Sequence, residues 1–265
     1  LASFDLKYMR EQDHEALLKP GPGLPYALRP GAKVLIIGPG GGWDVARALA
    51  GGSRNVTGVE INPIIASTVM QQRYATYTRG LYAAPEVRIV IEEGRSFIRR
   101  TREKFQVIQA TLVDTWASTA AGAYALAENY LYTTNAFRDY LSHLTGDGLL
   151  AFTRWGLEPP RESLRLVSLA KAALAEVGEP EPWRHIIVVR EGRPDDALGW
   201  GAMDTVLVAR KPFSRQDLEH ARKIIARSGF KIIYLPDEAG DNPFYQLLKT
   251  HDPGAFYAQY PYDVR

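Results

Sequence analysis

The feature that most constrains the fold of this chain is a series of short, apolar, β-branched runs that alternate with amphipathic segments of helix length. The first run, residues 34–37, ends in glycines, and a helix-compatible stretch then reaches Ala50. This alternation is typical of a parallel sheet that helices cover on both faces. The further strands that we expect are 55–60, 87–91, 107–112, 149–153, 186–189 and 205–209, and the further helices are 64–77, 96–103, 134–144, 161–177 and 214–228.

This order of elements predicts an α/β fold, because right-handed crossovers between parallel strands give a doubly wound sheet. We expect a mostly parallel, seven-stranded sheet whose last two strands, on either side of the polar loop 191–201, form an antiparallel edge pair. The turn formers before the sheet predict a lead-in segment at 1–30, and the α/β domain follows at 31–235. The prolines and aromatic residues of 236–265 predict an irregular C-terminal arm.

The composition excludes several kinds of site. The chain has 265 residues and no cysteine, so it has no disulfide framework, thiolate zinc site, iron–sulfur cluster or cysteine nucleophile. Its 32 Lys and Arg against 30 Asp and Glu give a net charge of +2, which favours a small-molecule substrate over a nucleic-acid partner. The five histidines are scattered, so we expect no metal.

The hydropathy pattern and the first residues bear on location. No apolar run approaches the roughly 18–20 residues that are needed to span a bilayer. The sequence starts at Leu1, with neither an initiator methionine nor a basic leader. We therefore expect a soluble, cytoplasmic chain that has been cut from a longer protein.

A glycine-rich turn, residues 38–42, lies between the first strand and the first helix of the sheet region. Glycines in this place permit positive φ and let a ligand approach the backbone closely. The third glycine position of a GxGxxG motif is occupied by Trp43, so the motif is instead the GxGxG form, with Gly38, Gly40 and Gly42. That form is found in enzymes that bind S-adenosylmethionine (SAM). The alternative is a glycine-rich turn without a ligand.

Acidic residues follow the next two strands, where a nucleoside would lie. Glu60 ends the second strand about 20 residues after the turn, as expected of the acid that accepts the ribose hydroxyls, and Ile61 follows it. Glu93, Gly94 and Arg95 follow the third strand, where such folds hold the adenine. A carboxylate there can accept from the exocyclic amine, and a glycine leaves room for the ring. The alternatives are a solvated carboxylate at a strand end for Glu60 and an exposed acid on a loop for Glu93.

The order of motifs from about residue 33 to residue 155 resembles the catalytic domain of spermidine synthases, the polyamine aminopropyltransferases. The motifs that carry the resemblance are Val34-Leu35-Ile36-Ile37-Gly38-x-Gly40, Glu60, Glu93-Gly94-Arg95-x-Phe97, Phe105-x-Val107-Ile108, Leu131-Tyr132-Thr133-x-x-Ala136-Phe137 and Leu144-x-x-x-Gly148. The resemblance implies a class I SAM-methyltransferase-like fold. It also implies SAM or decarboxylated SAM as co-substrate, with no metal.

A second set of motifs is similar to the spermidine-synthase-like domains of large bacterial membrane proteins. It consists of Gln109-x-x-Leu112-Val113-Asp114-Thr115-Trp116, Glu128-Asn129-x-Leu131-Tyr132-Thr133 and Thr153-Arg154-Trp155. In those proteins the domain accompanies a multi-helix membrane region. The partners to consider are therefore a small-molecule amine, a second copy in a homodimer, and a covalently linked transmembrane region outside this sequence.

The family's catalytic residues match this chain only in part. Spermidine synthases carry an aspartate pair, D-x-x-D, after the fourth strand, and the two positions fall here on Thr111 and Asp114. Threonine is no base near neutral pH, and Gly41 stands where the family has an Asp in the glycine-rich turn. Asp114 is the predicted catalytic base and Glu128 the reserve carboxylate. The alternatives are a capping residue for Asp114 and a solvated acid for Glu128.

The function that these residues predict is transfer of an aminopropyl group from a SAM-type sulfonium donor to a polyamine or another amine. One alternative is a SAM-dependent methyltransferase. The other is a non-catalytic nucleoside-binding sensor domain of a membrane protein.

Overall fold

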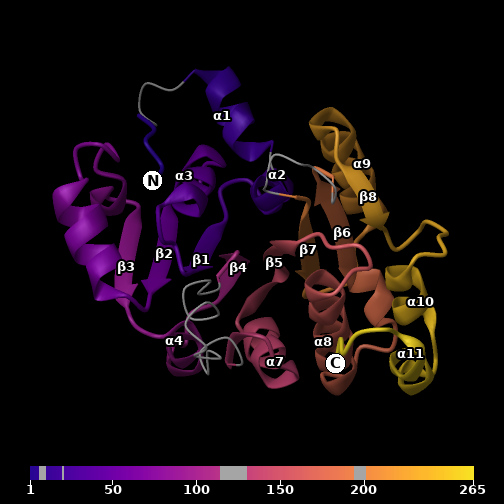
Figure 1. Cartoon of the computed structure of the whole chain (residues 1–265). Coiled ribbons are helices and arrows are strands. Elements are labelled where there is room, and N and C mark those ends of the chain that lie inside the picture. The colour runs from indigo at the N-terminus through magenta and orange to yellow at the C-terminus, as the bar shows by residue number, and fades with distance from the viewer. Residues whose placement is uncertain (6–9, 20, 114–129, 194–200) are drawn as a thin grey trace.

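The computed structural model describes residues 1–5, 10–19, 21–113, 130–193 and 201–265. One eight-stranded sheet crosses the molecule in the order β3-β2-β1-β4-β5-β7-β6-β8, and helices lie on both of its faces (Figure 1). The strands are β1 (Lys33–Ile37), β2 (Asn55–Glu60), β3 (Val87–Ile91), β4 (Phe105–Thr111), β5 (Leu144–Trp155), β6 (Ile186–Glu191), β7 (Met203–Ala209) and β8 (Lys231–Tyr234).

The sheet is parallel from β3 to β5 and antiparallel beyond. β7 pairs antiparallel with both β5 and β6, and β8 pairs antiparallel with β6. The predicted antiparallel pairing of the last two expected strands is confirmed, but neither strand is an edge. The prediction of seven strands was one short, because β8 has four residues and follows a helix directly, so its sequence has too few alternations to mark a strand.

Helices cover the sheet because its strands alternate their side chains between two apolar layers. Leu35 and Ile37 of β1 face a core that they share with α4, α7, α8 and α10, whereas Val34 and Ile36 face α1 and α3. The helices are α1 (Glu11–Leu18), α2 (Leu24–Leu28), α3 (Trp43–Ala50), the π-helical segment η2 (Ile64–Arg73), α4 (Gly94–Arg100), α7 (Thr134–Ser142), α8 (Glu162–Glu176), α9 (Arg215–Ser228), α10 (Pro243–Lys249) and α11 (Pro253–Gln259).

The two ends of the chain are more regular than expected. The predicted lead-in contains α1 and α2, and the predicted irregular arm contains α10 and α11. The prolines of residues 236–265 led to the wrong prediction of an irregular arm. Pro243 and Pro253 stand at the start of their helices, where proline is favoured because its missing N–H needs no partner. Asn242 caps α10 by accepting the backbone N–H groups of Phe244 and Tyr245 at 2.9 and 3.3 Å.

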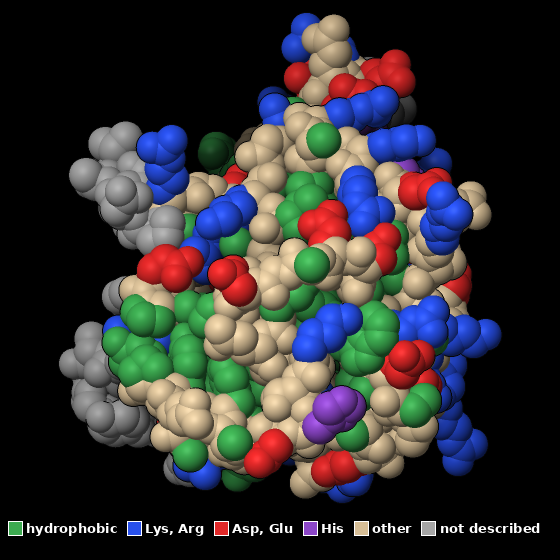
Figure 2. Space-filling model, turned by 90° about the vertical axis from the view of Figure 1, so that its right-hand side faces the viewer, with side chains coloured by type: hydrophobic (Ala, Val, Ile, Leu, Met, Phe, Trp, Pro, Cys, Tyr) green, Lys and Arg blue, Asp and Glu red, His purple; other side chains and the backbone are tan. Residues whose placement is uncertain are grey.

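The face formed by α9, β8, α10 and α11 is shown in Figure 2. Basic and acidic side chains are interspersed over most of it, and hydrophobic side chains gather toward one lower corner. The mixture agrees with the small net charge of +2.

A buried ion network joins β6, β7 and α8. Asp204 is fully buried and accepts from Arg190 Nε at 2.7 Å, from Arg190 Nη2 at 3.0 Å and from Ser163 Oγ at 2.6 Å. Gly156 makes room for the network, because a Cβ at this position would lie 2.7 Å from Asp204 Oδ1. A buried charge that keeps its partner is tolerated, whereas one that loses its partner is strongly destabilising.

Replacing Asp204 with asparagine tests this network. The change nearly keeps the side-chain shape and removes the buried carboxylate that Arg190 contacts, while the ion pair of Arg190 with the exposed Glu158 remains. Because charge-assisted hydrogen bonds are lost, we expect the free energy of unfolding to fall by about 2 kcal/mol. Urea denaturation followed by circular dichroism measures the change. Asp263→Asn is the matched control, because Asp263 and its partner Arg265 are both exposed and their pair should add no measurable stability. Equal effects of the two substitutions would contradict the proposed importance of the network.

Candidate functional site

A pocket lies at the carboxyl ends of β1, β2, β3 and β4. Its volume of about 340 Å³ suits a small molecule, since such sites span roughly 300–1,000 Å³. Ligands of open α/β sheets bind at this edge of the sheet. The residues that line it are Ile37, Gly38, Gly40, Val59, Glu60, Ile61, Asn62, Ile65, Glu93, Gly94, Leu112, Val113 and Leu131.

The glycine-rich turn borders this pocket with two of its three predicted glycines. Gly38, Gly40 and Gly42 have φ angles of 64°, 48° and 87°, a backbone conformation that favours glycine. A Cβ on Gly38 would lie 3.0 Å from the two methyl groups of Val113, another pocket residue. A Cβ on Gly42 would instead lie 2.6 Å from Leu81 Cδ2, and Gly42 is absent from the pocket wall. Gly42 therefore packs against Leu81 and allows the turn to form, but it does not contact the pocket.

Glu60 joins the turn to the loop after β2. Its side chain is 4% exposed, Oε2 accepts the Gly40 N–H at 3.1 Å, and Oε1 accepts the Asn62 N–H at 3.0 Å. The Tyr82 hydroxyl donates to the Gly40 carbonyl at 2.8 Å. Burial, and then the charges of Glu60 and Asp44, raise the pKa of Tyr82, so its hydroxyl stays a donor. Each Glu60 oxygen keeps a lone pair with which it can accept from a ligand.

Glu93 and Gly94 form the pocket floor after β3. The Glu93 carboxylate caps α4, because it accepts the backbone N–H groups of Arg95 and Ser96, both at 2.8 Å. Gly94 approaches β1 so closely that a Cβ there would lie 2.6 Å from Ile37 Cγ2. Both residues line the pocket, and each also has a structural role that its motif did not reveal.

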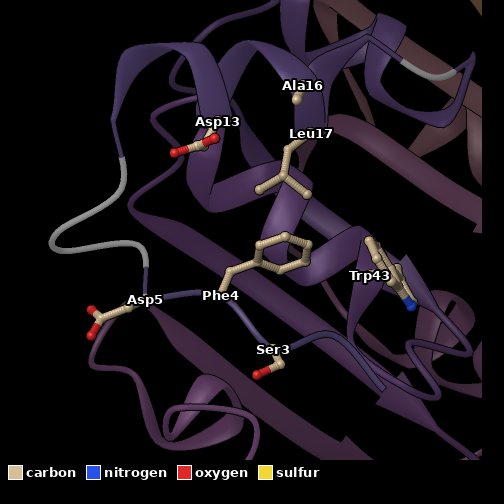
Figure 3. Close-up of a pocket in the computed structure, with 7 residues that line it drawn as sticks. All are labelled: Ser3, Phe4, Asp5, Asp13, Ala16, Leu17 and Trp43. Atoms are coloured by element: carbon tan, nitrogen blue, oxygen red, sulfur yellow. The ribbon is translucent and has the colours of Figure 1, made fainter.

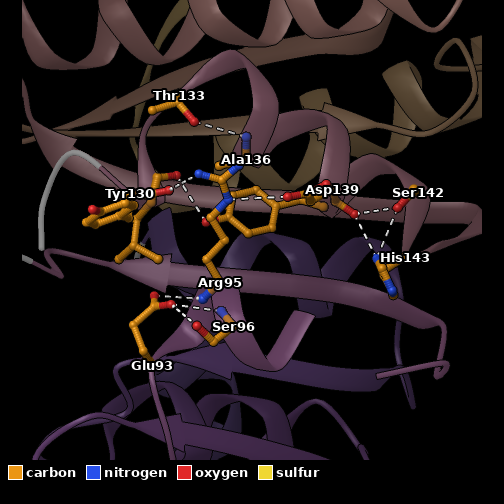
Figure 4. A network of polar contacts seen from close by, with 11 residues as sticks. Glu93, Arg95, Ser96, Tyr130, Thr133, Ala136, Asp139, Ser142 and His143 are labelled. Atoms are coloured by element: carbon orange, nitrogen blue, oxygen red, sulfur yellow. Dashed lines mark hydrogen bonds and ion pairs between the residues drawn. The ribbon is translucent and has the colours of Figure 1, made fainter. Parts of the chain in front are cut away.

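Of two further predicted site residues, Arg95 and Ile61, only Ile61 lines the pocket. The Arg95 side chain does not line the pocket and turns toward α7, where Nε lies 3.3 Å from Asp139 Oδ2 (Figure 4). Ile61 lies at the pocket rim, with 59% of its surface exposed. An exposed isoleucine beside buried Glu60 offers an apolar surface that a flat ring could cover.

Seven lining residues were not among the predicted site residues: Ile37, Val59, Asn62, Ile65, Leu112, Val113 and Leu131. Leu112 has φ of 48°, one of two non-glycine residues with positive φ in the described part of the chain. This conformation costs a leucine about 1–2 kcal/mol, and such strain often occurs at functional sites. The sequence carried a weak signal for these residues, because Leu112, Val113 and Leu131 belong to motifs that follow predicted strands.

The two predicted catalytic residues, Asp114 and Glu128, lie outside the described residues. The chain on either side of them reaches the pocket, and the Tyr132 hydroxyl donates to the Val113 carbonyl at 3.3 Å. Thr111, at the position of the family's first aspartate, ends β4 with a buried hydroxyl that has no hydrogen-bond partner among the described residues. It does not line the pocket.

A second cavity, of about 470 Å³, lies between the N-terminal residues, α1 and the start of α3 (Figure 3). Trp43 lines it with 46% of its surface exposed, and the Phe4 ring meets the Trp43 ring edge-on at 5.2 Å. The Ala2 N–H donates to the Gly41 carbonyl at 2.7 Å, so this segment packs on the outer side of the glycine-rich turn. No residue predicted for the site lines this cavity.

The structure bears on metals and on membranes within the residues that it describes. Among the residues that the structure describes, no group of three or more His, Asp or Glu side chains is arranged so that it could hold a metal ion. In the same part of the chain, no helix combines the length and apolar character that crossing a bilayer requires.

Comparison with known proteins supports the resemblance. No profile of a known protein family matches the chain. The chain is 33% identical over 105 residues to the polyamine aminopropyltransferase of Sulfurisphaera tokodaii, a match that covers 38% of this chain and 33% of that protein. It is 29% identical over 136 residues to the polyamine aminopropyltransferase of Sulfolobus acidocaldarius, covering 51% of this chain and 41% of that protein. The chain thus spans less than half the length of these curated relatives.

The solved structures extend the similarity to the fold. The spermidine synthase of Thermotoga maritima superposes with a TM-score of 0.53 at 17% identity, over 96% of this chain and 71% of that one. An identity this low identifies a shared fold and no more. The chain has the α/β fold of spermidine synthases, and part of its sequence is similar to polyamine aminopropyltransferases.

Proposed function

We propose that this chain is a spermidine synthase-like transferase that moves an aminopropyl group from decarboxylated SAM to an amine. The observation that carries the proposal is the arrangement of buried Glu60 against the glycine-rich turn, at the sheet edge where a nucleoside would bind. The partial similarity to polyamine aminopropyltransferases supports the reaction class. Glu60 would accept the ribose hydroxyls, and the apolar residues around Gly94 would enclose the adenine.

The reaction requires a neutral amine in line with a carbon–sulfur bond. The amine nitrogen attacks the aminopropyl carbon next to the sulfonium, and the carbon–sulfur bond breaks with its electron pair going to sulfur. Methylthioadenosine leaves as a neutral thioether, and the attacking nitrogen, now an ammonium, gives up one proton to a base. Positioning supplies most of the acceleration, and a carboxylate base contributes roughly 10²–10⁴-fold.

A non-catalytic nucleoside sensor is the second candidate, and a specific observation favours it. Thr111 stands at the position of the family's first aspartate, and a threonine hydroxyl is no base near neutral pH. Incubation with decarboxylated SAM and an amine separates the candidates, because a sensor binds the donor without forming methylthioadenosine. Offering SAM as well tests methyl transfer, which would yield S-adenosylhomocysteine.

Glu60→Gln tests the nucleoside site. The glutamine removes the charge and places an NH₂ group against the Gly40 or Asn62 N–H, so one donor faces another. We expect the dissociation constant for methylthioadenosine to rise at least about tenfold in titration calorimetry.

The control for this variant is Glu92→Gln on the same side of the sheet. Glu92 pairs with Arg100 and does not line the pocket, so nucleoside affinity should not change. The nucleoside proposal fails if the wild-type chain binds none of methylthioadenosine, SAM and decarboxylated SAM at millimolar concentration. It also fails if Glu60→Gln and Glu92→Gln bind alike.

Asp114→Asn tests the catalytic base. The substitution keeps the side-chain shape and deletes the charge, so turnover should fall at least about 10²-fold while donor affinity stays nearly unchanged. The same assay on Glu128→Gln ranks the reserve carboxylate. Loss of donor affinity or thermal stability with turnover per folded molecule intact would make Asp114 a capping or structural residue.

A further inference from the structure

Arg95 connects two parts of the pocket that are distant in sequence (Figure 4). Its backbone N–H donates to Glu93 Oε1 on the pocket floor at 2.8 Å. Its guanidinium extends the other way: Nε donates to Asp139 Oδ2 on α7 at 3.3 Å, and Nη1 donates to the Tyr130 carbonyl at 3.4 Å. Arg95 therefore contacts Glu93 on the pocket floor, the helix α7, and residues 130–132, which we call the return segment.

That return segment, residues 130–132, supplies Leu131 to the pocket wall. Two tyrosine hydroxyls also hold it: Tyr140 donates to the Leu131 carbonyl at 3.0 Å, and Tyr132 donates to the Val113 carbonyl at 3.3 Å. Of these three tethers, the one from Arg95 is charged and starts from α4, which Glu93 caps. The Arg95 tether therefore links the position of Glu93 on the pocket floor to the position of Leu131 in the pocket wall.

We propose that Arg95 is a positioning residue of the nucleoside site. Paired with Asp139, it holds the Tyr130 carbonyl so that Leu131 completes the apolar wall of the pocket. The inference rests on the proposed function, because it takes the nucleoside as the ligand. The sequence predicted that Arg95 contacts the nucleoside directly. In this proposal Arg95 instead affects nucleoside binding by fixing the position of Leu131.

The chemistry of the side chain explains why this position has an arginine. The planar guanidinium presents Nε and Nη1 in a fixed fork, so it can hold a carboxylate and a carbonyl at once. A lysine has a single ammonium group and would not hold both acceptors in one orientation. The Arg95 and Asp139 side chains are 17% and 26% exposed, so salt screens their attraction less than that of fully exposed pairs.

Three variants, one control and a conservative replacement, Arg95→Lys, test the proposal. The variants are Arg95→Met, Asp139→Asn and the two combined. Arg99→Met is the matched control, because Arg99 lies on the same helix, is exposed, and makes no hydrogen bond or ion pair with any residue that the structure describes. Titration calorimetry with methylthioadenosine measures affinity, and thermal unfolding measures stability.

We expect Arg95→Met to weaken methylthioadenosine binding about tenfold, the effect of losing charge-assisted hydrogen bonds. Asp139→Asn should weaken it as well, and the double variant should bind no worse than Arg95→Met, because both substitutions break one tether. Arg95→Lys should recover part of the affinity. Arg99→Met should bind like the wild type.

Two outcomes would overturn the proposal. If Asp139→Asn keeps full affinity while Arg95→Met loses it, Arg95 contacts the nucleoside directly. If both substitutions lower the melting temperature while affinity per folded molecule stays the same, the pair serves stability alone.

A measurement without ligand separates this inference from the proposed function. Hydrogen exchange of the amides in residues 130–136 should become about tenfold faster in Arg95→Met and in Asp139→Asn, but not in Arg99→Met. Unchanged exchange contradicts the positioning role even if nucleosides bind. Failure of the wild-type chain to bind any nucleoside contradicts the proposed function, whatever the exchange rates.

Discussion

The site depends first on a single buried carboxylate between two backbone segments. Glu60 accepts one N–H from the glycine-rich turn and one from the loop after β2, so the two segments are fixed relative to each other. Without this bridge, both N–H groups would need other partners, because a buried unpaired donor costs about 1–3 kcal/mol. The same carboxylate lines the pocket, so the form of the turn and the chemistry of the pocket wall depend on one side chain.

The rest of the pocket is built by residues that have their main contacts elsewhere. Glu93 caps a helix, Gly94 packs on β1, and Leu112 adopts a costly backbone conformation at the end of β4. Tyr82 holds the turn through the Gly40 carbonyl, whereas Glu60 holds it through the Gly40 N–H. The pocket therefore keeps its form without a ligand, as expected of a preorganised small-molecule site.

The sequence predicted the central strands well for a physical reason. β1 and β4 lie in the middle of a sheet covered on both faces, so their residues must be largely apolar whatever packs on them. β8 and the two C-terminal helices were missed because a short strand has little periodicity and because proline can begin a helix as well as end one.

The motifs located the pocket but not the direction of each side chain. Gly42 and Arg95 belong to the quoted motifs, yet one packs behind the turn and the other reaches α7. Their directions depend on Leu81 and Asp139, which are distant in sequence. Such contacts follow from tertiary packing, and no local pattern encodes them.

The close approach of Gly94 to Ile37 also constrains how this pocket can evolve. Ile37 is 3% exposed and belongs to the main apolar core, and the same side chain borders the pocket floor. A larger residue at 94 needs a smaller one at 37, and a smaller residue at 37 leaves a cavity in the core. The shape of the pocket and the packing of the core are thus coupled at this point, so a relative with a larger residue at position 94 should have a smaller residue at position 37.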